Sequence, residues 1–309
     1  MINAVPLNVL VTGGAGFLGR AVARAYRQLG SRVTGIGHSH WTLAAATEAG
    51  YMDWYSSSVD AEGLSQLEGS FDVVVHCAGN GSVPFSMTHP REAFERTVQT
   101  TLDVLEFSRA QARPPMVVYP SSAAVYGAAP DERLTESSPS HPVSPYGFHK
   151  RMVEDLLASY ASHSGVRAAV IRFFSIYGAG LNKQLLWDAS HKLCAGEDSV
   201  TFWGTGEETR DWIHASDAAQ LVVEAARLET PFTVLNGGSG ERVTVLETLR
   251  ALRAQLHSNT EIKFNGTVRP GDPRYYHADT SRAMQTGWQP TVKLEDGFKD
   301  YAQWFKDNR

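Results

Sequence analysis

The sequence predicts an α/β fold, in which a doubly wound parallel sheet is followed by a smaller mixed C-terminal domain. In the first half, short apolar runs alternate with segments of helical spacing, and a glycine-rich turn follows the first run. In the second half this alternation becomes irregular and polar, glycine-rich loops interrupt it. Strand and helix in strict alternation predict a mainly parallel sheet with helices on both faces.

The expected strands are short apolar runs bounded by turns or by helical patterns. They lie at residues 8–11, 32–36, 72–76, 116–119 and 168–174. Apolar residues at helical spacing predict helices at residues 17–29, 91–109, 146–162, 217–227 and 245–256. Between residues 128 and 145 the chain is rich in Pro and Ser, which indicates a surface loop.

The glycine-rich turn reads Thr12-Gly-Gly-Ala-Gly-Phe-Leu-Gly19. Glycine permits a tight turn and lets a pyrophosphate approach the backbone, while the following helix offers free N–H groups and a positive dipole end. Gly19 lets this helix pack closely on the strand. Because the motif follows a strand and opens a helix, it predicts a Rossmann-type dinucleotide site at Gly13, Gly16 and Gly19.

The end of the second strand bears on which dinucleotide is bound. An NAD site usually has an acidic residue there, which holds the ribose hydroxyls. In this chain Gly37 stands in that place, followed by His38 and Ser39, which can donate hydrogen bonds to a 2′-phosphate. Arg20, at the start of the first helix, is a further candidate partner. We therefore expect NADP(H) as the cofactor, with NAD(H) as the alternative.

Composition argues against several other classes of protein. The formal net charge is −5, so no basic surplus points to nucleic acid or to an anionic membrane. No apolar run reaches the roughly 18 residues of a membrane span, and the N-terminus lacks the pattern of a signal peptide. The two cysteines, Cys77 and Cys194, form no CxxC pair, so neither a disulfide framework nor a zinc site is expected. We expect a cytoplasmic protein without a metal.

The length of 309 residues allows one large domain or two joined ones. We expect residues 1–175 to form the dinucleotide-binding domain and residues 176–309 to form a second, ligand-binding domain. The boundary is soft, and the chain is expected to cross back into the first domain around residues 211–240.

Tyr146 and Lys150 form a candidate catalytic pair. Four residues apart on a helix, they share a face, and an ammonium group lowers the pKa of a nearby phenol. Such a phenol can give or take a proton as hydride moves. Ser121 and Ser122 follow a strand on the side of the sheet where ligands bind, so a hydroxyl there can hold a substrate oxygen. A structural alternative for Tyr146 and Lys150 is an ordinary pair on the protein surface. For Ser121 and Ser122 it is a turn or a helix cap.

Seven motifs in order resemble those of the extended short-chain dehydrogenase/reductase family, the NAD-dependent epimerase/dehydratase group. The resemblance covers nearly the whole chain. The motifs are Thr12–Gly19, Asp72–Ala78, Ser121–Gly127, Ser144–Lys150, Arg172–Gly178, Gly204–His214 with Asp217, and a C-terminal set of Arg269–Asp272, Ala278–Ser281 and Gly287–Pro290.

This resemblance implies catalytic roles for three residues. Tyr146 is then the proton donor or acceptor, Lys150 positions the nicotinamide ribose and tunes Tyr146, and Ser122 is the catalytic hydroxyl. Ser122-Ala-Ala124 differs from the Thr-Asp-Glu of the family's 4,6-dehydratases, which argues against elimination of water.

The resemblance also implies contacts with a nucleotide-diphosphate sugar. Arg210 and Arg269 match arginines that hold the diphosphate, and guanidinium suits phosphate because it forms bidentate, charge-assisted bonds. Ser175 replaces a usual asparagine, and Thr97 and Thr100 replace an asparagine and a glycine of a preceding helix. The remaining expected contacts are Phe17, Leu18 and Ala78 to the cofactor, and Ser121, Ser122 and Ser175 to the substrate.

Two reactions at C4 of the sugar share this chemistry. A 4-ketoreductase delivers hydride from NADPH once, whereas a 4-epimerase removes hydride, lets the keto sugar rotate and returns hydride to the other face. Because Gly37 favours NADPH and Trp203–Gly206 resembles sugar-nucleotide reductases, we expect the reductase, with a UDP-glucose 4-epimerase-like enzyme as the alternative. A non-catalytic, NAD(P)-sensing Rossmann protein is a third possibility, which the presence of both Tyr146 and Lys150 disfavours.

A homodimer is implied by the same resemblance, with pairing through the helices at residues 91–109 and 146–162. The second of these helices has an apolar face that is compatible either with a dimer contact or with cover of the sheet. This face consists of Val153, Leu156, Leu157 and Tyr160.

Overall fold

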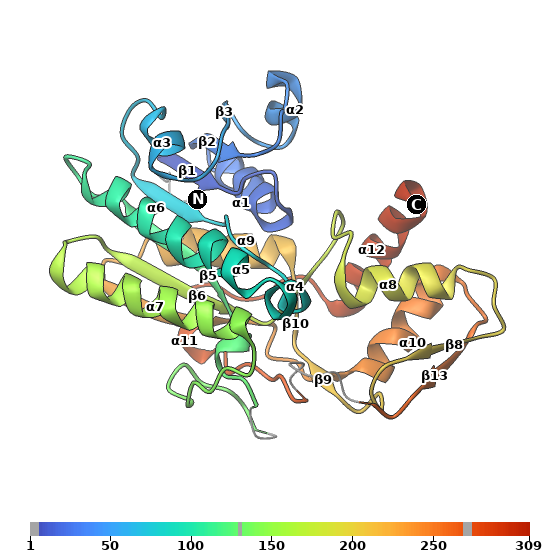
Figure 1. Ribbon diagram of the computed structural model, residues 1–309. Helices are drawn as coiled ribbons and strands as arrows, with labels where there is room; N and C mark the ends of the chain where they lie inside the picture. Colours follow the sequence, from blue (N-terminus) through green and yellow to red (C-terminus); the bar gives the residue numbers. More distant parts are fainter. Residues whose placement is uncertain (1–5, 129–131, 268–273) are drawn as a thin grey trace.

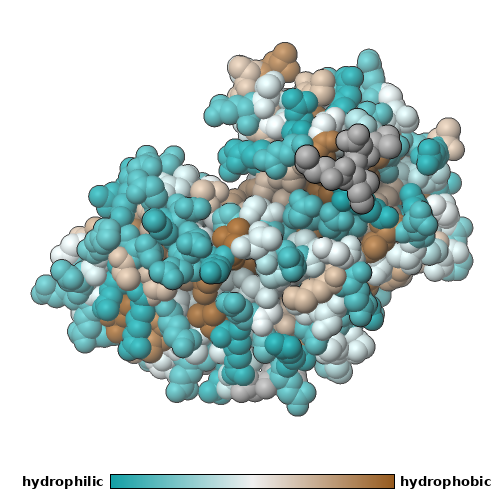
Figure 2. Space-filling view, turned by 180° about the vertical axis from the view of Figure 1, so that it is seen from behind, coloured by the Kyte–Doolittle hydropathy of each residue, from teal (hydrophilic) through white to brown (hydrophobic). Residues whose placement is uncertain are grey.

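A computed structural model describes residues 6–128, 132–267 and 274–309 of the chain. Figure 1 shows a larger lobe, built on a sheet flanked by helices, and a smaller lobe that contains α8, α10, α12, β8 and β13. None of the described helices is long and apolar enough to cross a membrane. The face in Figure 2 is mainly hydrophilic, with hydrophobic residues in small groups.

The central sheet has the strand order β11-β6-β5-β4-β1-β2-β3, and every pairing in it is parallel. The order reverses between β1 and β4, which is where ligands bind in open α/β sheets. The strands are β1 (Asn8–Thr12), β2 (Arg32–Gly37), β3 (Asp53–Ser56), β4 (Val73–His76), β5 (Met116–Ser122), β6 (Ala168–Phe173) and β11 (Phe232–Gly237). The expected α/β fold with a parallel sheet is confirmed.

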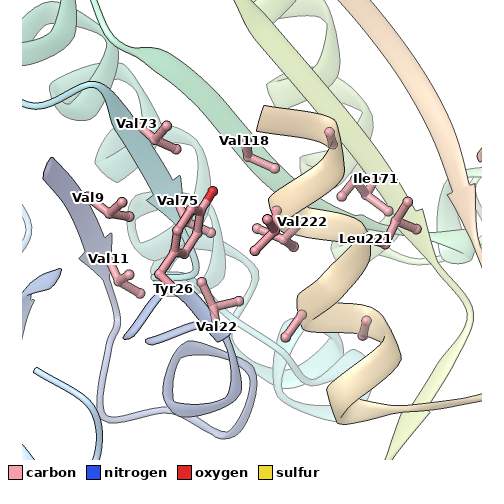
Figure 3. Packing of buried hydrophobic residues seen from close by; sticks show 14 of the residues in the cluster. Val9, Val11, Val22, Tyr26, Val73, Val75, Val118, Ile171, Leu221 and Val222 are labelled. Atoms are coloured by element: carbon pink, nitrogen blue, oxygen red, sulfur yellow. The ribbon is translucent and has the colours of Figure 1, made fainter. Parts of the chain in front are cut away.

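Helices cover both faces of this sheet because successive strand residues point to opposite sides. On β1, Val9 and Val11 pack with α1 (Phe17–Gln28) and α9 (Ala215–Ala226), as Figure 3 shows. Leu10 packs on the other side, with α6 (Thr100–Arg109) and α7 (Pro145–His163). Shorter helices border the strand ends: α2 (Leu43–Glu48), α3 (Ala61–Ser65), α4 (Val83–Thr88), α5 (Pro90–Phe94), α11 (Ser281–Met284) and the 3₁₀ turn Ala123–Val125.

Several elements differ from the sequence-based expectation, which did not include β3, the outer strand β11 or the helices at Gln184–Leu193 and Leu294–Asn308. The edge strand β3 was not expected, because its half-buried Asp53–Ser56 segment is not an apolar run. The single helix expected at residues 91–109 is interrupted by a π-helical turn at Glu95–Gln99. The apolar face of α7 covers the sheet, since Val153 and Leu157 are buried in its core.

The smaller lobe has its own apolar core. This core joins α8 (Gln184–Leu193), α10 (Val245–Leu256) and α12 (Leu294–Asn308) to the parallel pair β8 (Ser199–Phe202) and β13 (Glu261–Phe264). Two short pairs connect the lobes: β7 (Ser175–Tyr177) with β10 (Trp212–His214), and β9 (Thr209–Arg210) with β12 (Val243–Thr244). After β10 the chain returns to the larger lobe through α9 and β11.

Candidate active site

The glycine-rich turn connects β1 to α1. Gly13 has a φ of 62°, and Gly16 N donates a hydrogen bond to Gly13 O at 2.9 Å. A Cβ at Gly13 would lie 2.6 Å from the backbone N of Ala78 on the loop after β4. Helix α1 has no capping side chain from the described residues and no acidic residue in its first turn. Its N–H groups and dipole therefore fit a dinucleotide diphosphate. This turn contains three expected cofactor contacts, Phe17, Leu18 and Gly19.

The end of β2 has room for a side chain that this sequence lacks. A Cβ at Gly37 would lie 3.5 Å from the Trp54 ring, which is ordinary van der Waals contact. The carbonyl of Ser39 accepts hydrogen bonds from Trp54 Nε1 at 2.8 Å and from Ser56 Oγ at 3.0 Å. His38 is exposed. The loop after β2 is thus held by β3, and it offers no carboxylate to the cofactor.

Arg20, the candidate partner of a 2′-phosphate, lies beside the loop that follows β7. Its Nη2 is 3.6 Å from the position of a Cβ at Gly180, and the ring of Phe17 is 3.8 Å from the same point. Gly180 follows β7, so the guanidinium points towards the junction of the two lobes.

The side chains of Ser122 and Tyr146 lie close enough for the serine hydroxyl to lower the pKa of the phenol. Ser122 ends β5, and Tyr146 lies in the first turn of α7. This turn is fixed by Ser144 Oγ, which accepts from Gly147 N at 3.2 Å, and by Ser86 Oγ, which accepts from Tyr146 N at 3.0 Å. Burial raises the pKa of the Tyr146 phenol, and the neighbouring Ser122 hydroxyl opposes that shift.

Lys150 lies one turn further along α7 and is buried. Its Nζ donates to Pro120 O at 2.8 Å and lies 4.4 Å from the centroid of the Tyr119 ring. The same atom is 5.9 Å from the centroid of the Tyr146 ring. Burial lowers the pKa of Lys150 to about 8. The ammonium is therefore close enough to stabilise a Tyr146 phenolate.

Ser121 points away from this pair, because neighbouring residues of a strand face opposite sides. Its Oγ donates to Glu154 Oε1 at 2.6 Å, and Glu154 also forms a buried ion pair with Arg172 at 2.7 Å. The Ser121 hydroxyl is therefore committed to a structural network. The expected contact of Ser121 with substrate gains no support from this geometry, which leaves Ser122 as the hydroxyl beside Tyr146.

A chain of hydrogen bonds supports the loop after β4. Thr12 Oγ1 lies 2.7 Å from His76 Nδ1, and His76 Nε2 lies 3.0 Å from Thr101 Oγ1. Burial lowers the pKa of His76 to about 3, so the imidazole is neutral. Thr97, in the π-helical turn, accepts a hydrogen bond from Asn80 N at 3.2 Å through its hydroxyl. Thr97 thus fixes the loop that follows Ala78.

The expected substrate contacts Ser175 and Arg210 lie where the two lobes meet. Ser175, on β7, donates its N–H to Asp211 O at 2.9 Å. Arg210, on β9, is half-buried, and its guanidinium lies 5.9 Å from the centroid of the Tyr276 ring. Arg269, the second expected diphosphate ligand, lies outside the described residues.

The buried carboxylate of Asp211 holds together the loops around Arg210. It accepts hydrogen bonds from the backbone N–H groups of Ser239, Gly240 and Ala278 at 2.6, 3.1 and 3.0 Å. The role of Asp211 in the Arg-Asp motif is therefore structural.

Lys183 is a residue of this region that the sequence analysis did not single out. Its Nζ lies 3.5 Å from the position of a Cβ at Gly81, in the loop between β4 and α4. A cation from the loop before α8 thus reaches the loop that precedes α4, the helix whose Ser86 contacts the backbone of Tyr146. No spacing rule connects these two segments, so sequence reasoning had no means of finding the contact.

Clusters of three or more His, Cys, Asp or Glu residues that could hold a metal ion are absent from residues 6–128, 132–267 and 274–309.

Comparison with known proteins identifies the family. The model of the NAD dependent epimerase/dehydratase family matches residues 9–237. A UDP-glucose 4-epimerase of Azospirillum brasilense is 30% identical to this chain, over 96% of this chain and 90% of its own.

Two solved structures share the whole fold. A UDP-N-acetylglucosamine 4-epimerase from Methanobrevibacter ruminantium M1, in complex with UDP-N-acetylmuramic acid, has a TM-score of 0.89 and 25% identity, covering 99% of this chain and 100% of its own. The UDP-glucose 4-epimerase of Thermus thermophilus, in complex with NAD, has a TM-score of 0.87 and 25% identity, covering 98% and 100%. With a dinucleotide turn beside a Ser-Tyr-Lys group, the chain belongs to the NAD dependent epimerase/dehydratase family of extended short-chain dehydrogenases/reductases.

Proposed function

We propose that this protein is a nucleotide-sugar 4-epimerase that keeps NAD bound. The observation that carries the proposal is Tyr146 between the Ser122 hydroxyl and the Lys150 ammonium, which lies 5.9 Å from the centroid of its ring, in a chain similar over nearly its full length to a UDP-glucose 4-epimerase. The 4-epimerase, given above as the alternative, thus replaces the expected 4-ketoreductase. None of the relatives reported above is a 4-ketoreductase.

NAD rather than NADP(H) is the proposed cofactor. The Thermus thermophilus structure contains NAD. Arg20 lies beside Gly180, which leaves His38 and Ser39, in the loop after β2, as the candidates for a 2′-phosphate. An absent carboxylate at Gly37 removes repulsion of that phosphate, but it supplies no positive charge to bind it.

The glycine-rich turn and the start of α1 would hold the diphosphate of the cofactor, and Lys150 its nicotinamide ribose. When bound, NAD would supply the group that takes up the hydride from C4 of the sugar and gives it back to the other face. Tyr146 takes the proton of the C4 hydroxyl and later gives it back, and Ser122 holds the same oxygen through its hydroxyl. Lys150 stabilises the phenolate in the interval, because its ammonium lies over the phenol ring.

We assign the substrate's nucleotide diphosphate to the smaller lobe. In this proposal residues 176–309 form the substrate domain, apart from the return of α9 and β11 to the central sheet. Arg210 and Arg269 bind the diphosphate, and Ser175 contacts the sugar at the junction of the lobes.

We also propose that the protein is a homodimer. Exposed apolar side chains on α4, on α7 and in the segment just before α7 support this assembly. They form one apolar surface, which contains Met87, Val143, Phe148 and Met152. Single exposed apolar residues are common on protein surfaces, but four large ones next to each other indicate an interaction surface. The cytoplasmic setting remains a prediction.

The test is interconversion of sugars without added cofactor. Purified protein is incubated with UDP-glucose, UDP-N-acetylglucosamine or UDP-glucuronic acid, and the products are separated by chromatography. The bound nucleotide is released by denaturation and identified. We expect a 4-epimeric product and stoichiometric NAD. Net NADPH consumption with a 4-keto-6-deoxy nucleotide sugar, without interconversion, would establish the reductase instead.

A further inference from the structure

Tyr51 lies beneath the glycine-rich turn, on the side of β2 and β3. It precedes β3 and is fully buried. Its Oη lies 2.9 Å from Gly14 O and 3.0 Å from Gly19 O, and its single proton is shared between these two carbonyls. One phenol therefore contacts both the turn and the first helical turn of α1.

The fit between Tyr51 and the turn explains why position 14 is glycine. A Cβ at Gly14 would lie 2.6 Å from Tyr51 Oη and 3.0 Å from the ring of Trp54. Gly13, by contrast, is required by the backbone of Ala78, at 2.6 Å. The two adjacent glycines thus avoid clashes with different neighbours: Gly13 with the backbone of Ala78, and Gly14 with the phenol of Tyr51.

The phenol is held rigidly in this position. Its ring packs edge-on against Trp54, with centroids 5.3 Å apart, and Trp41 lies 6.3 Å away on the same side. Trp54 is itself anchored by its hydrogen bond to Ser39 O. Burial raises the pKa of Tyr51, so the phenol remains a donor at neutral pH.

Fixing the Gly14 carbonyl also fixes the next N–H. In a trans peptide the C=O of one residue and the N–H of the next point in opposite directions. Because Gly14 O faces Tyr51, the N–H of Ala15 faces the opposite side of the turn. Gly14 is buried, whereas Ala15 and Gly16 are half-exposed and exposed. The N–H of Ala15 therefore points to the side that is open to a ligand.

We propose that Tyr51 is a positioning residue for the cofactor: its phenol orients the glycine-rich turn so that backbone N–H groups meet the dinucleotide diphosphate. The inference rests on the proposed dinucleotide but not on the reaction, since it concerns binding alone. It goes beyond the glycine motif, because the donor that shapes the turn lies 37 residues away from Gly14.

The experiment compares Tyr51→Phe with Tyr26→Phe. Both changes remove one hydroxyl from a buried phenol near α1, but among the described residues Tyr26 Oη has no hydrogen-bond partner. The Kd of nucleotide-stripped protein is measured for NAD⁺ and ADP-ribose by calorimetry, and for adenosine by competition. One net hydrogen bond corresponds to about a 3- to 10-fold loss of affinity. We expect this loss for NAD⁺ and ADP-ribose in Tyr51→Phe, and less than a twofold change in Tyr26→Phe.

Adenosine lacks the diphosphate and provides the second readout. If Tyr51 positions the turn, its removal leaves adenosine affinity unchanged, and kcat at saturating NAD⁺ stays within twofold. Equal affinity of Tyr51→Phe and wild type for ADP-ribose, or an equal loss for adenosine, overturns the inference. If Tyr51→Phe does not fold, Gly14→Ala tests the same contact, because its Cβ displaces the phenol; unchanged ADP-ribose affinity then overturns it. Failure of wild type to bind any dinucleotide would instead refute the proposed function.

Discussion

Arg172 and Glu154 form an ion pair at 2.7 Å in which the side chains are only 6% and 4% exposed. Glu154 lies one helical turn after Lys150, and Ser121, which precedes Ser122, donates to the same carboxylate. The pair therefore ties β5, β6 and α7 together next to the residues proposed to be catalytic.

Removal of one partner should destabilise the protein strongly. In Glu154→Leu the guanidinium of Arg172 stays buried without its carboxylate, and we expect the free energy of unfolding to fall by about 3–5 kcal/mol. The double variant Glu154→Leu/Arg172→Met should recover much of that loss. Urea denaturation measures both changes, and a double variant no better than the single one would contradict this account.

Tyr146→Phe should abolish turnover while NAD binding persists. The change removes the proton-transfer group but keeps the ring, and we expect kcat to fall by about 10²- to 10⁴-fold. Ser122→Ala should reduce kcat less, because the phenol remains. Product formation and bound NAD are measured on the same preparation, with Tyr26→Phe as the control. Survival of full activity in Tyr146→Phe would show that another group moves the proton.

Activity should decline at alkaline pH. Burial lowers the pKa of Lys150 to about 8, so its ammonium loses a proton as the pH rises through that value. Tyr146 then loses the positive charge that stabilises its phenolate, and kcat/KM should fall above about pH 8. Glu154 raises the pKa of Lys150, so Glu154→Gln should move this decline to lower pH. A constant kcat/KM up to about pH 9.5 would be inconsistent with a titrating Lys150.

Gly37→Asp should strengthen the preference for NAD over NADP. The backbone there has room for a Cβ, and a carboxylate can bind the ribose hydroxyls while it repels a 2′-phosphate. We expect the ratio of the two Kd values to change by about tenfold or more in favour of NAD, which corresponds to about 1.4 kcal/mol. Gly37→Ala adds the Cβ without the charge and should leave the ratio unchanged. An unaltered ratio in Gly37→Asp would mean that the ribose binds elsewhere.

Phe148→Glu should dissociate the proposed dimer. Phe148 is 52% exposed and belongs to the apolar surface on α4 and α7, and burying a carboxylate there without a partner is costly. Sedimentation velocity at micromolar concentration should show a dimer for wild type and a monomer for the variant. Leu43→Glu, at an exposed apolar residue on α2, is the matched control and should remain dimeric. A monomeric wild type would refute the assembly.

The sequence by itself determined the fold class, the family and the positions of five of the seven strands of the central sheet. These properties depend on local patterns: apolar runs predict buried strands, and glycine spacing predicts the turn before α1. Tyr146 and Lys150 are likewise related by a short spacing, and the structure places the Lys150 ammonium 5.9 Å from the centroid of the Tyr146 ring.

Only the tertiary structure decided which contacts the side chains of neighbouring residues make. Ser121 and Ser122 are adjacent and chemically identical, yet the pleat of β5 directs one to Glu154 and the other to Tyr146. The hydrogen bonds of Tyr51 and the orientation of Arg20 towards Gly180 depend on residues far away in sequence. No local periodicity encodes such contacts, because they arise when separate strands and loops are packed together.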